Sequence, residues 1–387
     1  MGEKPNNAAI EPFRIAISAD ELDALKERLA TVRWPAPTPG GWERGVPHGY
    51  LRELSEYWRT GFDWRKQERT LNALPQFTTT IDGQAIHFVH VRSPEPKAMP
   101  LVLSHGYPGS FVEFLDTVGP LTDPRAHGGN PADAFDVVIP SIPGFGFSTP
   151  LGEGWTVNRT ALAFAELVRR LGYGRYGAQG GDIGAGISGA LASLDPDRVA
   201  GVHVNSDPRA VGWVLEHLPV DLSKLDEQDQ AEVETMRRLY DDAKGYLVLQ
   251  TTRPATIGYA LTDSPVAQLA WIAEKYKEWT NLPGDPDTPP IDRDRLLTIV
   301  SIYWFSRSGA SAAEFLYDVA HAQEWAPPGP APQGWALFAA QGFVRKLMDP
   351  ERKIAHWKEY ASGGHFAALE SPAILIDDVR TFFRSVR

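Results

Sequence analysis

Short apolar runs that alternate with helix-like segments constrain the fold of this chain more than any other feature. Three of these runs suit strands that are buried on both faces of a sheet, where apolar residues are continuous rather than alternating. They are LVLSH (101–105), FDVVIPSI (135–142) and VAGVHVN (199–205). Helix-like segments at 160–171 and 187–194 lie between the last two runs. Because parallel strands need crossover helices, this alternation predicts an α/β protein with a mostly parallel sheet.

The residues before these runs predict helices followed by a hairpin. Ser18 and Glu21 fit a capping box ahead of LDALKERLATV, and residues 50–59 have the spacing of a second amphipathic helix. FTTTIDGQAIHFVHV (77–91) is then typical of two strands joined by an Asp-Gly turn. We therefore expect an N-terminal helical extension over residues 1–75 and the sheet core after it.

Length and composition narrow the class of protein. The chain has 387 residues, more than one average domain, and its 43% hydrophobic and 22% charged residues are ordinary for a soluble globular protein. A net charge of −11 disfavours nucleic acid as a partner, and the absence of cysteine excludes disulfides and thiolate chemistry. The polar N-terminus has no signal-peptide pattern and no run of about 18 apolar residues occurs, so we expect a cytoplasmic protein without a membrane partner.

The segment QGGDIGAGI (179–187) has the glycine frame of a nucleophile elbow, with Asp182 at its centre. Gly180 and Gly184 flank the aspartate, where a tight strand-to-helix turn leaves no room for a Cβ atom. A side chain on such a turn points out of the sheet and sits at a helix N-terminus, which stabilises its anion. The plain alternative is a glycine-rich loop in which Asp182 caps a helix.

Two further segments have the positions that a hydrolase of this kind needs. HGYPGS follows a predicted strand, and the backbone N–H groups of Tyr107 and Ile183 would together form an oxyanion hole. GGHFAALESP lies near the C-terminus, where the α/β-hydrolase chain order puts the histidine after the nucleophile and the acid. We expect His365 to be that histidine.

Taken together, several segments resemble epoxide hydrolases of the microsomal type, in a soluble, bacterial-like form. The resemblance covers roughly residues 11–385 and rests on the stretch from RWPAP to HVRSP together with QGGDIG, HGYPGSFVEF, PGFGFSTP and GGHFAALESP. It implies an α/β-hydrolase core (76–206 and 326–387), a helical lid (207–325) and the N-terminal extension. It also implies an enzyme that opens an oxirane to a vicinal diol without a metal or an organic cofactor.

The resemblance gives Asp182 and His365 successive roles. Asp182 would attack the oxirane to form an alkyl-enzyme ester, and His365 would activate the water that cleaves the ester. The N–H groups of Tyr107 and Ile183 would hold the oxyanion. A carboxylate suits this chemistry, because a serine would form an ether that water does not readily cleave. The family also uses two lid tyrosines as proton donors, and Tyr246, in GYLVLQTTRPATIGYALTDSP, matches the first.

The second lid tyrosine is the first departure from the family pattern. In YWFSRSGASAAEFLYD, Leu316 occupies its place and Tyr317 lies one position on. A shift of one residue turns a side chain by about 100° around a helix. We therefore expect Tyr317 to reach the substrate oxygen only if the helix is locally re-registered.

The acid is the second departure. Gln341, in ALFAAQGF, stands where the family carries Glu or Asp. An amide can orient His365 but brings no charge, and in serine triads such a change costs up to about 10⁴ in rate. Asp207, in VHVNSDP after the preceding strand, is an alternative acid, and Asp349, in LMDPERK, is expected to lie too far along a helix. Without a replacement acid, hydrolysis of the ester would slow more than its formation.

Several functions therefore stay open from the sequence. The first is an epoxide hydrolase, and 12 tryptophans together with a wide lid favour a bulky apolar or aromatic substrate. The two departures from the family pattern favour a specialised role in tailoring a natural product. The second is an ester hydrolase or deacylase in the same pocket. The third is a ligand-binding pseudoenzyme, which Gln341 and Leu316 favour. A haloalkane dehalogenase is disfavoured, because those enzymes usually carry Trp where this chain has Ile183. The expected partners are a small epoxide and water, and a homodimer is one possible assembly.

Overall fold

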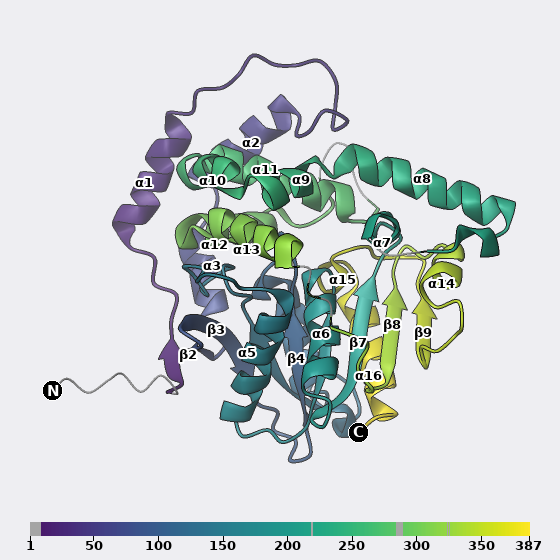
Figure 1. Cartoon of the computed structure of the whole chain (residues 1–387). Coiled ribbons are helices and arrows are strands. Elements are labelled where there is room, and N and C mark those ends of the chain that lie inside the picture. Colours follow the sequence, from purple (N-terminus) through teal and green to yellow (C-terminus); the bar gives the residue numbers. More distant parts are fainter. Residues whose placement is uncertain (1–8, 218–219, 284–288, 323, 325) are drawn as a thin grey trace.

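The sheet that organises the molecule is seen in a computed structural model, which describes residues 9–217, 220–283, 289–322, 324 and 326–387. The first eight residues of the predicted extension and residues 284–288 of the predicted lid lie outside the described residues. The strands of the described residues form one nine-stranded sheet in the order β1-β2-β3-β5-β4-β6-β7-β8-β9. Helices flank this sheet on both faces, which confirms the predicted α/β class (Figure 1).

The sheet combines an antiparallel edge with a parallel centre. Each of β1, β2 and β3 pairs in antiparallel fashion, whereas β5, β4, β6, β7, β8 and β9 run parallel to one another. The strands are β1 (Glu11–Phe13), β2 (Gln76–Ile81), β3 (Gln84–Val91), β4 (Met99–Ser104), β5 (Phe135–Pro140), β6 (Tyr176–Gly180), β7 (Val199–Ser206), β8 (Gln333–Leu337) and β9 (His356–Glu359). The carboxyl ends of the parallel strands therefore meet at one edge, which is where open α/β sheets bind ligands.

The N-terminal extension contains a short strand, three helices and an irregular segment (31–47) between the first two helices. The prediction of helices alone is wrong for β1, which pairs with β2 through Glu11 and Thr78. A three-residue strand has no periodic pattern to reveal it, and Pro12 is tolerated because the strand is at the sheet edge. The rest of the extension forms α1 (Ala19–Ala30), α2 (His48–Thr60) and α3 (Trp64–Leu71). The predicted capping box at Ser18 and Glu21 is present.

Helices of the core lie against the sheet and present their apolar faces to it. The predicted helices at 160–171 and 187–194 are α5 (Val157–Arg170) and α6 (Ile183–Leu194), so α6 begins directly after Asp182. The others are η1 (Phe111–Phe114), α4 (Leu115–Thr122), η2 (Pro131–Asp133), α14 (Phe343–Met348), α15 (Ala367–Glu370) and α16 (Pro372–Arg384). The elbow aspartate thus stands at the junction of β6 and α6.

A helical segment inserted between β7 and β8 covers the carboxyl ends of the parallel strands (Figure 1). We call residues 207–325 the lid. Its helices are α7 (Ala210–His217), η3 (Leu222–Lys224), α8 (Glu227–Ala243), α9 (Gly245–Thr252), α10 (Pro254–Asp263), α11 (Pro265–Trp279), α12 (Arg293–Ser306) and α13 (Ser308–Ala322). Eight consecutive residues of α12, 296–303, are buried, so this helix is enclosed by protein on all sides.

The N-terminal extension packs against the lid. Helices α1 and α2 contact α11, and the Trp58 Nε1–H of α2 donates a buried hydrogen bond of 3.0 Å to Ser301 Oγ of α12. The Tyr57 hydroxyl donates to Asp294 Oδ1 at 2.7 Å. These contacts join residues more than 230 positions apart, so the extension stabilises the position of the lid over the sheet.

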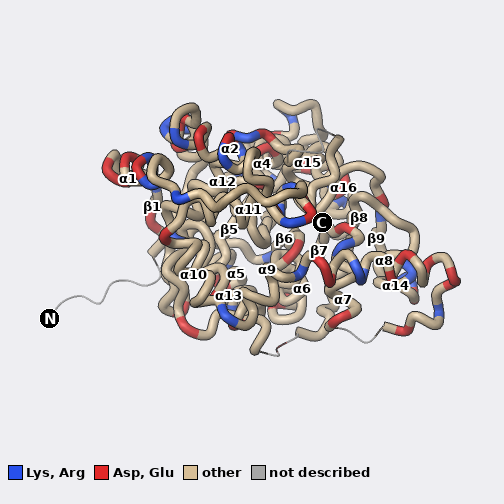
Figure 2. Tube along the Cα trace, turned by 90° about the horizontal axis from the view of Figure 1, so that it is seen from above, with Lys and Arg blue, Asp and Glu red and all other residues tan. Residues whose placement is uncertain are grey.

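Charges on the molecule are mixed in sign. Seen from above, Lys and Arg residues are interspersed with Asp and Glu residues along the chain (Figure 2). No helix in the described part of the chain is long and apolar enough to cross a bilayer.

A buried carboxylate ties the last strands to the C-terminal helix. Asp378 of α16 accepts hydrogen bonds from His203 Nε2 of β7 and His356 Nε2 of β9, each at 2.8 Å, and from the Tyr360 hydroxyl. The Asp378 side chain is 1% exposed, so its charge depends on these donors for stabilisation. The bonds fix β7, which leads to Asp207, and β9, which leads toward the His365 loop.

Replacement of Asp378 by Ala should therefore destabilise the fold. The change leaves two imidazoles and one phenol without their buried acceptor, and we expect the free energy of unfolding to fall by about 3 kcal/mol. Denaturant titration followed by circular dichroism measures this loss. Asp377→Ala is the matched control, because Asp377 is exposed on the same helix. Equal losses in the two variants would contradict the role of the buried carboxylate.

Candidate active site

The turn between β6 and α6 holds Asp182 in a strained conformation. Its backbone has φ 54° and ψ −129°, a region that residues other than glycine rarely adopt. A Cβ atom on Gly180 would lie 2.3 Å from the Gly184 carbonyl oxygen, and one on Gly184 would lie 2.0 Å from that of Ser104. Both flanking positions therefore require glycine, as the sequence predicts for an elbow.

A backbone N–H donates to one oxygen of the aspartate. The Tyr107 N–H donates a hydrogen bond of 2.8 Å to Asp182 Oδ1. Ile183 is the first residue of α6, so its N–H belongs to the group that has no acceptor within a helix. Of the two predicted oxyanion donors, Tyr107 N–H on the HGYP loop thus contacts Asp182, and Ile183 N–H lies at the start of the helix that follows it.

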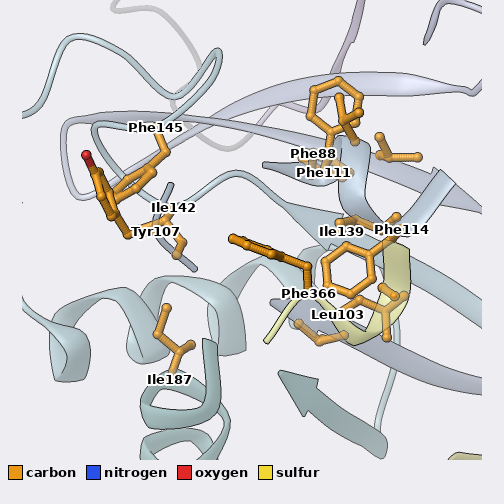
Figure 3. Packing of buried hydrophobic residues seen from close by; sticks show 14 of the residues in the cluster. Phe88, Leu103, Tyr107, Phe111, Phe114, Ile139, Ile142, Phe145, Ile187 and Phe366 are labelled. Atoms are coloured by element: carbon orange, nitrogen blue, oxygen red, sulfur yellow. The ribbon is translucent and has the colours of Figure 1, made fainter. Parts of the chain in front are cut away.

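His105 fastens the HGYP loop to the next loop of the core. It is 1% exposed, Ile142 N donates to its Nε2 at 3.3 Å, and its Nδ1 lies 3.1 Å from the Gly106 carbonyl oxygen. Burial lowers the pKa of His105 to about 4, which keeps the ring neutral as this bonding pattern requires. Figure 3 shows Tyr107 beside Ile142 and Phe145, the apolar residues that the loop packs against.

His365 lies between two carboxylates. Its Nε2 is 3.6 Å from Asp182 Oδ2, and its Nδ1 is 3.0 Å from Asp207 Oδ2. The backbone N–H of His365 donates to the Trp279 carbonyl oxygen at 3.1 Å. The centroid of the Trp279 ring lies 4.8 Å from that of the imidazole. Burial by itself would lower the pKa of His365, but the Asp207 hydrogen bond and the Asp182 charge raise it above its usual value.

Asp207 follows β7 directly and is almost fully enclosed, with 2% exposure. Burial opposes its ionisation, but the His365 bond and the Arg209 charge hold the pKa of the Asp207 carboxyl below its usual value. The Arg209 backbone N–H donates to Asp207 Oδ1 at 2.8 Å, and the Arg209 guanidinium donates to the carbonyl oxygens of Glu278 and Trp279. Asp207 is therefore held as a carboxylate against the end of α11.

The two other candidate acids lie elsewhere. Gln341 is on the turn between β8 and α14, where its carbonyl oxygen accepts from Val344 N, and the His365 Nδ1 is occupied by Asp207 instead. Asp349 caps α14 and accepts from the backbone N–H groups of Lys353 and Ile354. The structure thus brings Asp207, and neither Gln341 nor Asp349, to the imidazole.

Tyr246 of α9 lies above the elbow among aromatic rings. Its ring stacks on Tyr107 at a centroid distance of 5.9 Å and meets the Trp279 edge at 5.2 Å. The buried Lys275 Nζ lies 4.6 Å from the Tyr246 centroid. Burial raises the pKa of Tyr246 well above its usual value and the Asp182 charge raises it further, so the phenol stays protonated near neutral pH.

Tyr317 points away from this site. Its ring stacks on His321 of the same helix at 3.9 Å, whereas Leu316 beside it is 8% exposed and belongs to the core. The hypothesis that a local re-registration brings Tyr317 to the site is wrong, because α13 is continuous over Ser308–Ala322 and the one-residue offset turns the side chain outward.

Glu113 is a site residue that sequence reasoning did not single out. It is 8% exposed and lines a cavity of about 20 Å³ together with Asp182 and His365. Phe114 and Phe366 also line this cavity, and Figure 3 shows these two rings near each other. The signal was present, because a glutamate within the apolar run FVEF has to be buried or functional. Among the described residues, those of this site included, no group of three or more His, Asp or Glu side chains is placed to hold a metal.

Comparison with known proteins decides the family. Residues 10–114 match the family described as Epoxide hydrolase N terminus, and residues 99–244 match the alpha/beta hydrolase fold. The chain is 34% identical to Epoxide hydrolase 1 of Sus scrofa, over 98% of this chain and 90% of that protein. It is 44% identical, over 98% of this chain and 86% of the relative, to a Stigmatella aurantiaca protein assigned to the epoxide hydrolases. The chain belongs to the epoxide hydrolase family.

Solved structures agree with this assignment. The Aspergillus niger epoxide hydrolase superposes with a TM-score of 0.81 and 30% identity, over 98% of this epoxide hydrolase and 97% of the fungal chain. The juvenile hormone epoxide hydrolase of Bombyx mori superposes with a TM-score of 0.80 and 28% identity, over 98% and 94% of the two chains. The α/β-hydrolase fold and the resemblance to microsomal-type epoxide hydrolases are thereby confirmed.

The partner of His365 can be tested by its titration. Asp207→Asn replaces a charge with a neutral amide, so the pKa of His365 should fall toward or below its ordinary value. NMR of protein labelled with ¹⁵N-histidine follows this change, and Gln341→Ala is the matched control that should leave the titration unaltered. A pKa that moves in the Gln341 variant and not in the Asp207 variant would show that the assigned partner is wrong.

Proposed function

We propose that this epoxide hydrolase converts an oxirane into a vicinal diol in two steps, through a covalent ester on Asp182. The observation that carries the proposal is that the two carboxylate oxygens of Asp182 have different neighbours. Oδ1 accepts the Tyr107 N–H at 2.8 Å, whereas Oδ2 faces His365 Nε2 at 3.6 Å. One oxygen is therefore held where an oxyanion would form, and the other is left as the nucleophile.

In the first step, Asp182 Oδ2 attacks an oxirane carbon and the bond from that carbon to the ring oxygen breaks. The oxygen leaves as an alkoxide, which needs a proton. Tyr246 supplies it, since its phenol is protonated and lies over the site next to Tyr107. The product is an alkyl-enzyme ester whose carbonyl oxygen, Oδ1, remains against the Tyr107 N–H.

In the second step, water attacks the ester carbonyl carbon and gives a proton to His365 Nε2. Negative charge then develops on Oδ1, where the N–H groups of Tyr107 and Ile183 stabilise it. Asp207 stabilises the imidazolium at Nδ1 and fixes the neutral tautomer before the step. Collapse of the intermediate breaks the bond between the Asp182 carboxyl carbon and Oδ2, and the departing alkoxide takes the proton from His365, which completes the diol. The hydroxyl proton left on the Asp182 carboxyl group returns to the Tyr246 phenolate through solvent, which regenerates the carboxylate and the phenol.

The position of Asp207 supports turnover rather than binding alone. A pseudoenzyme was favoured by Gln341, which cannot supply charge to the histidine, and by Leu316. With Asp207 Oδ2 at 3.0 Å from His365 Nδ1, the loss of the usual acid after β8 is compensated by a carboxylate after β7. The proposed mechanism therefore uses one lid tyrosine as proton donor. It has a nucleophile in Asp182, a base in His365 and an acid in Asp207.

The substrate that suits this site is an apolar epoxide with an aryl group. Aromatic side chains surround the elbow, among them Tyr107, Tyr246, Trp279 and Phe366. Such rings contribute apolar area and stack on planar groups. More specifically, we propose that the substrate is a bulky aromatic natural product that the enzyme modifies. An aryl epoxide is the probe that tests the preference for an aryl group.

The two steps should separate in the His365→Gln variant. Alkylation does not require the base, whereas hydrolysis should fall by about 10³, so a persistent adduct of substrate mass should accumulate. Intact mass spectrometry during reaction with styrene oxide, with diol measured in parallel, detects this. The wild-type enzyme should show a transient adduct on the Asp182 peptide that decays as diol appears.

Asp182→Asn is the matched control, because it retains the shape of the nucleophile and should give neither adduct nor diol. Diol formation by this variant, or ester cleavage without any epoxide opening in the wild type, would favour an ester hydrolase over the proposal.

Tyr246→Phe should slow formation of the adduct. Because Leu316 occupies the second position, loss of the Tyr246 hydroxyl removes the proton donor, and we expect alkylation to fall by about 10². Rapid-quench kinetics under single-turnover conditions measures the step. Tyr317→Phe is the control and should be unchanged, since Tyr317 lies against His321. Similar losses in both variants would show that Tyr246 has no special role.

A further inference from the structure

We propose that Glu113 is a positioning residue for the hydrolytic water, which it holds against His365 in a small polar cavity behind Asp182. The inference rests on the two-step function proposed above and assigns the site at which its second step recruits water. Four observations carry it: a cavity of suitable size, unpartnered buried polar groups on its wall, a loop shaped around the carboxyl group, and the chemistry that the second step needs.

The cavity has room for water and for little else. Its volume is about 20 Å³, and a cavity needs about 10–15 Å³ measured in this way to hold one water molecule. Asp182 and His365 both line it, so a water molecule there is adjacent both to the ester and to the base. Glu113 and Ser104 supply further polar groups, while Phe114 and Phe366 supply apolar wall.

Two polar atoms on this wall have no hydrogen-bond partner within the described chain. They are Glu113 Oε1 and Ser104 Oγ, and the two residues are 8% and 0% exposed. Buried polar atoms in native proteins nearly always have a partner, and an orphaned one costs about 1–3 kcal/mol. A water molecule bonded to both atoms and to His365 Nε2 would satisfy all three, which is the number of bonds typical of buried water.

The HGYPGS loop is built around the Glu113 carboxyl group. Glu113 lies in η1, whose first turn is capped by the Ser110 hydroxyl, and its carboxyl turns back under the loop. A Cβ atom on Gly109 would lie 1.5 Å from Glu113 Oε1, so any larger residue there would force the Glu113 carboxyl group to move. The Tyr303 hydroxyl donates to the Gly109 carbonyl oxygen at 3.0 Å and holds the loop from the lid side. The loop that provides an oxyanion donor thus also places a carboxyl group at the cavity.

An acceptor at Oε1 is what the attacking water requires. Water that gives one hydrogen to His365 Nε2 can give its second hydrogen to Glu113 Oε1, which leaves a lone pair directed at the ester carbon. The carboxyl group does not take the transferred proton, so His365 remains the base. Two fixed hydrogen bonds restrict the water to the attacking orientation, and such preorganisation lowers the barrier of the step.

The negative charge of Asp182, which is lost in the first step, affects the ionisation of Glu113. Burial raises the pKa of Glu113 to about 8, the His365 charge opposes this rise, and the Asp182 charge adds to it. Tyr276, which also interacts electrostatically with Glu113, is neutral, because burial raises its pKa well above the usual value. Esterification removes the negative charge of Asp182. The Glu113 carboxyl then ionises more readily and becomes a stronger acceptor at the stage at which water must attack.

The test compares Glu113→Leu with the near-isosteric Glu113→Gln, which keeps an oxygen acceptor. Single-turnover reaction with styrene oxide, followed by rapid quench and intact mass, gives separate rate constants for alkylation and hydrolysis. In Glu113→Leu we expect hydrolysis to fall by about 10–100-fold, the equivalent of one lost hydrogen bond to a polar buried group, and alkylation to stay within about threefold. Glu113→Gln should recover most of the hydrolysis rate but lose the pH dependence that the Glu113 carboxyl adds to that step.

Several results would overturn the inference. Equal losses in both steps of Glu113→Leu would indicate a structural role, and an unchanged hydrolysis rate would exclude any role. If Glu113→Leu does not fold, Ser104→Ala decides, because removal of the second water partner should slow hydrolysis severalfold and leave alkylation unchanged. A wild-type protein that forms neither adduct nor diol would overturn the proposed function as well, whereas a normal wild-type adduct beside an unaffected Glu113→Leu variant would overturn this inference alone.

Discussion

The site depends on one largely enclosed imidazole that lies between two carboxylates. His365 lies between Asp182 and Asp207, and Arg209 adds a positive charge beside Asp207 while its guanidinium donates to carbonyl oxygens at the end of α11. Two carboxylates and one imidazole in a low-dielectric setting would otherwise repel or neutralise one another. The lid segment that carries Arg209 and Trp279 is therefore an electrostatic part of the site as well as its cover.

Tertiary contacts keep this arrangement in register. The elbow aspartate follows β6, the acid follows β7 and the histidine precedes α15, so three separate segments must meet at the carboxyl edge of the sheet. Asp378 fastens β7 and β9 to α16 from below, and the N-terminal extension fastens α11 and α12 from above. A helix-and-strand extension far from the reacting atoms thereby limits how the lid moves relative to Asp182.

Local rules predicted those residues whose roles follow from backbone geometry. The flanking glycines of Asp182, the position of Tyr107 after a buried strand and the late histidine all depend on short-range spacing, and each lies where it was expected. The short edge strand β1 was missed because three residues carry no periodicity. Glu113 was missed because a glutamate in an apolar run does not reveal which cavity its carboxyl group enters.

The sequence by itself determined the α/β class, the elbow, the histidine and the family resemblance, because turns, strands and caps are encoded by neighbouring residues. It left the acid open, since Gln341 and Asp207 are both compatible with the end of a strand. Only the tertiary structure decided between them, because the distance from His365 Nδ1 to a carboxylate is set by how β7, β8 and the His365 loop pack. The cavity between Asp182, His365 and Glu113 likewise exists only once three segments distant in sequence have come together.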